Sequence, residues 1–166
     1  MPRRVEIDET LPAAVLPERI LNELFAHARE VHPEECCGLV IGDAAEPYAR
    51  VVRCTNDMTQ HHKRDPQNFP RDGRRAFWMN EREYMEAFDE AEKSGQDVTA
   101  VYHSHIDVGA YLSDMDLEFA EQPHFPFPEA DHIVLSVVGR VVRSAALFQR
   151  IDGRFVGRGI QHRASR

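Results

Sequence analysis

The sequence has few cysteines, no long apolar run and no surplus of positive charge. Three cysteines among 166 residues, two of them adjacent, do not make a disulfide framework, so we expect reduced thiols. The formal net charge of −8 argues against a general nucleic-acid binder. No stretch approaches the roughly 20 apolar residues of a membrane span, and no apolar run follows the N-terminal arginines, as a signal peptide requires. We therefore expect a cytoplasmic protein that binds neither nucleic acid nor membranes.

What is present is an ordinary globular composition with an uneven distribution of charge. The chain is 42% hydrophobic and 29% charged, and its length suits one domain of residues 1–166. Bases gather in residues 63–75 and 140–166, whereas acids gather in residues 81–97. These zones are either solvated faces or a docking surface for an acidic protein partner.

Hydrophobic periodicity and turn residues predict an alternation of helices and strands. Asn80 followed by Glu83 predicts a capped helix start, and the polar segment 55–73 predicts one long loop. The order of the predicted elements indicates a mixed α/β single domain with a central β-sheet flanked by helices. The predicted elements are a helix at 18–31, strands at 37–42 and 47–54, a short strand at 76–79, a helix from 81 to Gly95, a strand at 98–105, a helix at 113–120, and strands at 132–138, 141–149 and 154–160.

Two histidines one residue apart, His103 and His105, fall in the predicted strand 98–105. Residues two apart in a strand point to the same face, as two metal ligands must. Asp116 follows His105 by eleven residues, and a loop of that length can return its carboxylate to the two imidazoles. Two nitrogens and one carboxylate leave an open position, which is typical of catalytic zinc. The spacing from Ser113 to Asp116 equally fits a capping box, and the pattern alone does not choose between the two.

Glu35 precedes the apolar strand at 37–42, where a carboxylate can act as a general base toward water at a metal site. By itself, an acid at this position is more often a surface residue. Glu34, its neighbour, points elsewhere if the chain is extended here.

Taken together, these segments resemble the JAMM, or MPN-plus, metallopeptidase motif. Glu35-Cys36-Cys37-Gly38 matches its upstream E-x-C-G. His103 and His105, seven intervening residues, Ser113, two residues and Asp116 match its second part. The resemblance covers about residues 18–150 and is closest to short prokaryotic members. One departure is Ile106, where many members have proline, which affects the shape of the following loop rather than the ligands.

The resemblance implies a cytidine-deaminase-like α/β sandwich and a role for each motif residue. His103, His105 and Asp116 would hold one Zn²⁺ with a place left for water. Glu35 would take the proton of that water, and Ser113 would hydrogen-bond the oxyanion. Ser104, between the histidines, should face away from the metal, and Cys37 should be a small packing residue.

The activity implied is zinc-dependent hydrolysis of a peptide or isopeptide bond at the C-terminal tail of a ubiquitin-like sulfur carrier of the ThiS or MoaD type. The alternative is a non-catalytic interaction module of the same fold. A nucleoside deaminase is set aside because the chain has no C-x-x-C, and a two-histidine iron site fits Glu35 and Ser113 less well. Tyr111 should rim the site. His61 and His62 should face solvent from the long loop, with substrate contact as the alternative, and Phe77 and Trp78 should be packing residues.

Overall fold

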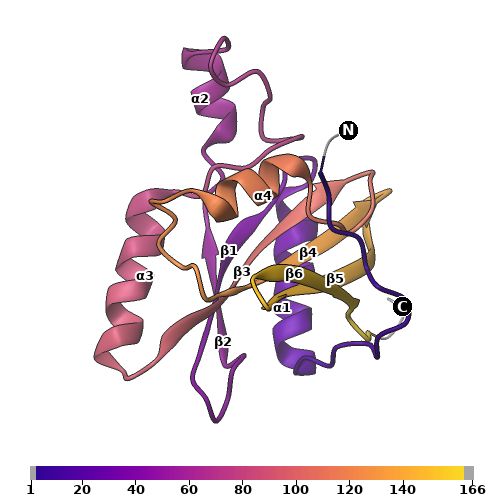
Figure 1. Cartoon of the computed structure of the whole chain (residues 1–166). Coiled ribbons are helices and arrows are strands. Elements are labelled where there is room, and N and C mark those ends of the chain that lie inside the picture. The colour runs from indigo at the N-terminus through magenta and orange to yellow at the C-terminus, as the bar shows by residue number, and fades with distance from the viewer. Residues whose placement is uncertain (1–2, 163–166) are drawn as a thin grey trace.

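The computed structural model describes residues 3–162 and contains a six-stranded sheet with helices on both faces (Figure 1). The strand order is β2-β1-β3-β4-β5-β6, and only β3 and β4 run parallel. The predicted mixed α/β fold is therefore confirmed. The elements are α1 (Glu18–Val31), β1 (Cys37–Gly42), β2 (Arg50–Cys54), α2 (Met58–Arg64), α3 (Glu81–Lys93), β3 (Asp97–Ile106), α4 (Asp114–Glu121), β4 (Asp131–Val138), β5 (Val141–Ile151) and β6 (Arg154–Gly159).

Helix α1 covers one face of the sheet, because Ile20, Leu21 and Leu24 fall on one side of it and pack on β3 and β4. Helices α3 and α4 lie over the opposite face, where Ala91 and Leu117 are buried. None of the helices in residues 3–162 has the length and apolar character to cross a membrane.

Strand β3 is central, and its side chains alternate between the two faces. Ala100 and Tyr102 enter the core beneath α1, whereas Val101 and His103 point to the face covered by α3 and α4. All of β3 from Val98 to His105 is buried except Thr99, which is half-buried. The face beneath α4 therefore receives both histidines near the carboxyl end of β3.

Two expectations for residues 55–79 are wrong. The segment expected to be a loop contains α2, which projects away from the sheet in Figure 1. No strand forms at 76–79, where only one isolated bridge joins Met79 to Asn56. The Asn56 side chain takes the place of a strand partner, since its oxygen accepts from the Trp78 N–H at 2.9 Å and its amide donates to the Ala76 carbonyl at 3.2 Å.

At the start of α3, the predicted cap by Asn80 is confirmed, but the predicted return contact from Glu83 is not formed. The Asn80 side chain accepts from the Glu83 N–H at 3.0 Å, as an N-cap should. The Glu83 carboxylate does not return to Asn80 but accepts from the N–H and hydroxyl of Thr55, at 2.8 and 2.9 Å. These two hydrogen bonds connect the first turn of α3 to Thr55, directly after β2.

Candidate active site

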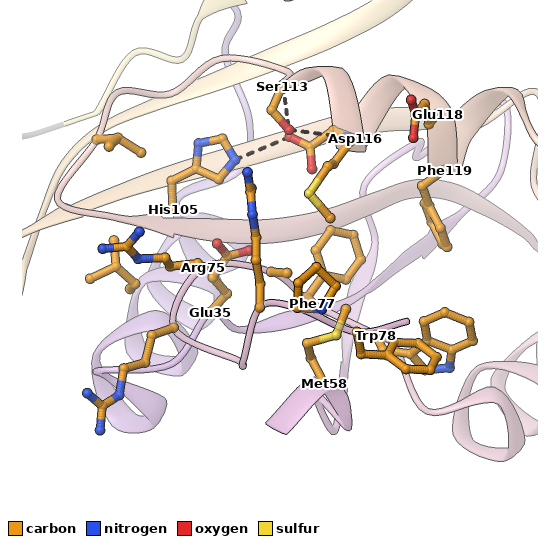
Figure 2. A pocket seen from close by; sticks show the side chains of 18 of the residues that line it. Glu35, Met58, Arg75, Phe77, Trp78, His105, Ser113, Asp116, Glu118 and Phe119 are labelled. Atoms are coloured by element: carbon orange, nitrogen blue, oxygen red, sulfur yellow. Dashed lines mark hydrogen bonds and ion pairs between the residues drawn. The ribbon is translucent and has the colours of Figure 1, made fainter. Parts of the chain in front are cut away.

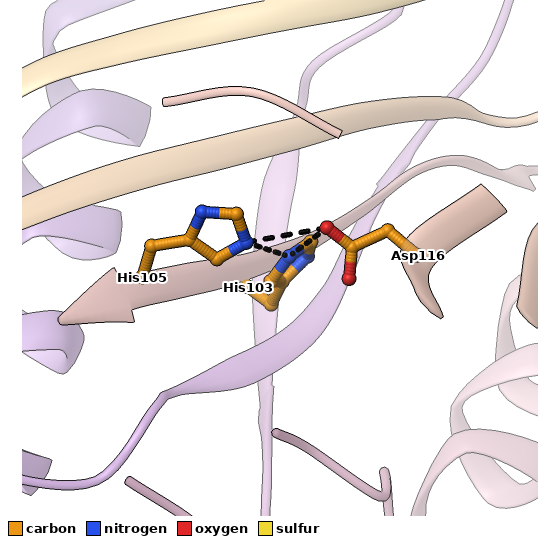
Figure 3. A group of neighbouring side chains, drawn as sticks. All are labelled: His103, His105 and Asp116. Atoms are coloured by element: carbon orange, nitrogen blue, oxygen red, sulfur yellow. Dashed lines mark hydrogen bonds and ion pairs between the residues drawn. The ribbon is translucent and has the colours of Figure 1, made fainter. Parts of the chain in front are cut away.

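Three side chains from two elements converge beneath the N-terminus of α4. His103 Nε2, His105 Nε2 and Asp116 Oδ2 are each 3.2 Å from the other two (Figure 3). All three residues are buried. The strand alternation that sequence reasoning used for the histidines is observed, and Ser104 between them points to the other face, where its Oγ accepts from the Cys36 N–H at 2.8 Å.

This arrangement suits a cation and is hard to explain without one. His105 Nδ1 lies 3.0 Å from the Gly109 carbonyl, so it carries the proton and leaves a lone pair on Nε2. That lone pair faces a carboxylate oxygen, so it takes up a cation there, either a second proton, which makes a charged imidazole that donates to Asp116, or a metal ion. A tetrahedral ion bonded at about 2.0–2.1 Å to each atom requires separations of about 3.3 Å between them. The donor set therefore fits zinc in type, number and spacing.

Asp116 also completes the capping box of α4. Its N–H donates to Ser113 Oγ at 3.1 Å, and its Oδ2 accepts from the Ser113 N–H at 2.9 Å. Burial by itself would raise the pKa of Asp116, but the charges and hydrogen bonds of His103 and His105 outweigh it and hold this pKa well below its usual range. The sequence left capping and metal binding as alternatives, and the geometry accommodates both.

Glu35 lies in the same cleft, 6% exposed (Figure 2). Its N–H donates to the Gly73 carbonyl at 2.7 Å, and its carbonyl accepts from the Asn56 side chain at 3.0 Å, so both backbone groups are fixed. Burial raises the pKa of its carboxyl well above the usual value, the charge of Asp116 adds to this, and Arg71 opposes it. Glu35 is thus a buried carboxyl in the same cleft as His105 and Asp116.

The cleft around these residues has a volume of about 870 Å³. One wall comes from the end of β3 and from α4, including His105, Ser113 and Asp116. The opposite wall comes from residues 32–35 and 68–78, with Arg75 and Phe77 among the labelled side chains of Figure 2. Glu35 and Ser113 line this cleft from opposite walls.

Comparison with protein families gives the family of the chain. Residues 17–150 match the family model described as prokaryotic homologs of the JAB domain. The chain belongs to this family, Prok-JAB. The match covers all the candidate residues, from Glu35 to Asp116, and confirms the family resemblance found in the sequence.

Curated relatives and solved structures resemble the chain over most of its length. The chain is 27% identical over 145 residues, 87% of either chain, to proteins named CysO-cysteine peptidase from Mycobacterium bovis and Mycobacterium tuberculosis. A protein from Desulfitobacterium hafniense has a solution structure with a TM-score of 0.62 at 21% identity, covering 89% of this chain and 90% of that one. One from Salinibacter ruber gives 0.56 at 25% identity, with coverages of 89% and 88%.

Sequence reasoning missed two features of this Prok-JAB site. Phe77, assigned to packing, stacks on the His103 ring with centroids 4.5 Å apart and an interplanar angle of 26°. Arg71, Arg74 and Arg75 line the cleft, although they appeared only as part of a basic zone. Local sequence patterns could not predict these two features, because Phe77 and the arginines lie more than 25 positions along the chain from the motif residues that they approach.

Tyr111 lies where it was expected, whereas His61 and His62 are packed rather than exposed to solvent. Tyr111 lines the cleft, with its ring centroid 5.0 Å from that of His105 in an edge-to-face arrangement and the Arg4 guanidinium 4.4 Å from its own centroid. His61 stacks with Phe69 and contacts Trp78, and His62 Nδ1 is 2.7 Å from the Phe69 carbonyl, so both histidines pack within their own segment. The three cysteines are buried and free.

Proposed function

We propose that this protein is a zinc-dependent peptidase that hydrolyses a peptide or isopeptide bond at the C-terminal tail of a sulfur-carrier protein. The observation that carries the proposal is the triangle of His103, His105 and Asp116 atoms, 3.2 Å on each side, in the same cleft as a buried glutamate. The name of the mycobacterial relatives supports the carrier-protein substrate.

His103, His105 and Asp116 would hold the zinc ion. When bound, the ion supplies Lewis acidity, which polarises the scissile carbonyl and lowers the pKa of water at the site. The stacked Phe77 ring and the Gly109 carbonyl fix the two imidazoles, so little reorganisation accompanies binding.

Glu35 acts as general base and then as general acid. Its carboxylate oxygen takes the proton of the attacking water and delivers it to the leaving amine. A raised pKa suits the second half of this task, because a carboxyl that holds its proton in a buried cleft can give it to a poor leaving group.

Ser113 stabilises the oxyanion. Its Oγ accepts the capping hydrogen bond from the Asp116 N–H, which leaves the hydroxyl hydrogen free to donate into the cleft. The two roles assigned to Ser113 therefore use different parts of one hydroxyl group and do not compete.

The test is to incubate the zinc-loaded protein with carriers of the ThiS or MoaD type that bear C-terminal extensions, and to measure intact mass. We expect loss of the residues beyond the diglycine end, and no loss after chelation of zinc. Unchanged mass for every carrier would overturn the substrate class.

The alternative is a non-catalytic interaction module of the same fold. It gives no reason for Glu35 to be buried opposite three converging ligand atoms. Such a module would bind the carrier without changing its mass, and would bind equally well after His105→Ala.

A further inference from the structure

We propose that Arg71, Arg74 and Arg75 form a subsite for the free α-carboxylate of a single C-terminal residue, which leaves as a free amino acid. This inference rests on the proposed function and names the leaving group. It favours a peptide bond at the chain end over an isopeptide bond to an internal lysine.

The first support is that the three guanidinium groups have no ion-pair partner among residues 3–162. Some other arginines among residues 3–162 form ion pairs, for example Arg19 with Glu46 and Arg53 with Glu23. Three unpaired arginines within five positions, all lining the cleft, form a concentrated positive charge in a protein of net charge −8. Such a cluster suits an anionic ligand.

The second support is that the segment carrying these arginines is built onto Glu35. The Gly73 carbonyl accepts from the Glu35 N–H at 2.7 Å, and the Gly73 N–H donates to Thr59 Oγ1 at 2.9 Å. The Asp72 side chain accepts from the Arg74 N–H at 3.0 Å and closes the turn. The backbone that carries the arginines is therefore fixed relative to the general base, and their exposed side chains extend from it.

The third support is the direction of the reaction. In hydrolysis the C–N bond breaks, water gives its hydroxyl to the carbonyl carbon, and a proton reaches the leaving amine through Glu35. The leaving group must then lie on the Glu35 side of the cleft, which is the side of the arginines. A lone leaving residue has its carboxylate two bonds from that amine, within reach of the same wall.

The chemistry of the two walls agrees with this orientation. Guanidinium groups bind carboxylates with paired hydrogen bonds, which an uncharged amide or a continuing chain cannot replace. Asp107 and Glu118 line the opposite wall, where their negative charge disfavours a carboxylate. An isopeptide substrate would present a lysine side chain to the arginines and leave them unpaired.

The test uses three peptides that end in Gly-Gly-Cys, Gly-Gly-Cys-amide and Gly-Gly-Cys-Ala-Ala, with the zinc-loaded enzyme and a phosphine reductant. We expect release of free cysteine from the first, with kcat/KM about tenfold to a hundredfold above the amide and the extended peptide. Equal rates for the acid and the amide would overturn the subsite.

Arginine variants test whether these side chains cause the preference for the acid over the amide. Replacing Arg71, Arg74 and Arg75 together with glutamine should bring the acid-to-amide ratio to about one, mainly through the KM of the acid. Arg143→Gln makes the same kind of change at an exposed position on β5 and should preserve the ratio. A triple variant that keeps the wild-type ratio contradicts the proposal.

Binding separates this inference from the proposed function. In Glu35→Gln, calorimetry should show tighter binding of the Gly-Gly-Cys acid than of its amide, by about tenfold or more, and the triple arginine change should remove the difference. Equal binding overturns the subsite even if the wild type cleaves carriers. Absence of cleavage with this difference intact overturns the peptidase activity and supports the subsite.

Discussion

One oxygen atom of Asp116 takes part in both the cap of α4 and the group of candidate metal ligands. Its Oδ2 accepts from the Ser113 N–H and lies 3.2 Å from both histidine Nε2 atoms. The helix cap thereby fixes the carboxylate that completes the ligand triangle, and α4 cannot shift without moving it. This coupling explains why the spacing from Ser113 to Asp116 is compatible with both interpretations of the sequence.

Two substitutions at Ser113 test whether its hydroxyl has a catalytic role separate from its capping role. Ser113→Ala and Ser113→Gly both remove the hydroxyl, and we expect both to lower kcat by about 100- to 1000-fold. Alanine should also lower the free energy of unfolding by about 1 kcal/mol, whereas glycine costs only a few tenths. Steady-state rates and urea titrations measure the two effects. Near wild-type kcat for Ser113→Gly would show that only the cap matters.

His132 is a buried histidine that the mechanism does not use. Its Nε2 is the one buried side-chain nitrogen or oxygen in residues 3–162 without a hydrogen-bond partner, and its ring lies between those of Phe125 and Phe155. Burial, and to a smaller extent the charge of His103, lower the pKa of His132 to about 3 against the opposing charge of Asp116. The side chain is therefore neutral in the folded protein over the ordinary pH range.

This lowered pKa predicts a loss of stability in acid. The unfolded chain takes up a proton at His132 below about pH 6.5, whereas the folded chain does so only near pH 3. Stability is present above pH 6.5 and falls by up to about 1.4 kcal/mol per pH unit between these values. His132→Phe should lose less stability than the wild type between pH 7 and pH 5 in thermal melts. An identical loss in both proteins would contradict this account.

At the scale of elements, strand β1 explains the glycine of the motif. A Cβ on Gly38 would lie 2.4 Å from the Val52 carbonyl oxygen of β2 and 2.5 Å from Tyr102 Oη of β3. Because β1 is packed between these strands, no side chain fits there without moving the backbone next to Glu35.

We therefore expect Gly38→Ala to destabilise the protein by about 2–3 kcal/mol. Gly109→Ala is the matched control, because its Cβ would meet nothing nearer than 3.6 Å. It should change stability by less than about 0.5 kcal/mol. Urea midpoints measure both variants. Equal midpoints would mean that β1 accommodates a larger residue.

The elements with strong hydrophobic periodicity could be predicted from the sequence. Helix α1 begins and ends where its apolar stripe and Pro33 indicate, and the turn at Gly139 and Arg140 joins β4 and β5 as expected. Helix α2 was missed because only Met58 among its seven residues is buried, so it has no apolar stripe. Its position depends on tertiary contacts, which local patterns do not record.

At the scale of the whole molecule, the candidate site joins three distant parts of the chain. Sequence spacing could group His103, His105 and Asp116 and associate Glu35 with them through the family motif. It could not place Phe77 on His103, or the arginines beside Glu35, because these contacts depend on how residues 55–79 fold over the sheet.

Bound zinc should stabilise the whole fold. Zinc that binds the folded chain at about 100 times its Kd adds about 2.7 kcal/mol, which for a chain of this length corresponds to a rise in Tm of about 5–10 °C. Differential scanning fluorimetry of chelated and zinc-loaded protein measures this. Glu35→Gln should keep the rise and His105→Ala should lose it. A rise that survives in His105→Ala would place the ion elsewhere.

The central claim is that Glu35 performs proton transfer at a zinc site. Its most direct test is the initial rate of trimming of one extended carrier by the wild type, Glu35→Gln and Glu34→Gln, each confirmed to hold one zinc per chain. The neighbouring Glu34 hydrogen-bonds Thr59 and does not line the cleft. We predict wild-type trimming for Glu34→Gln and a rate at least about 100-fold lower for Glu35→Gln. Equal trimming by Glu35→Gln and the wild type would contradict the account.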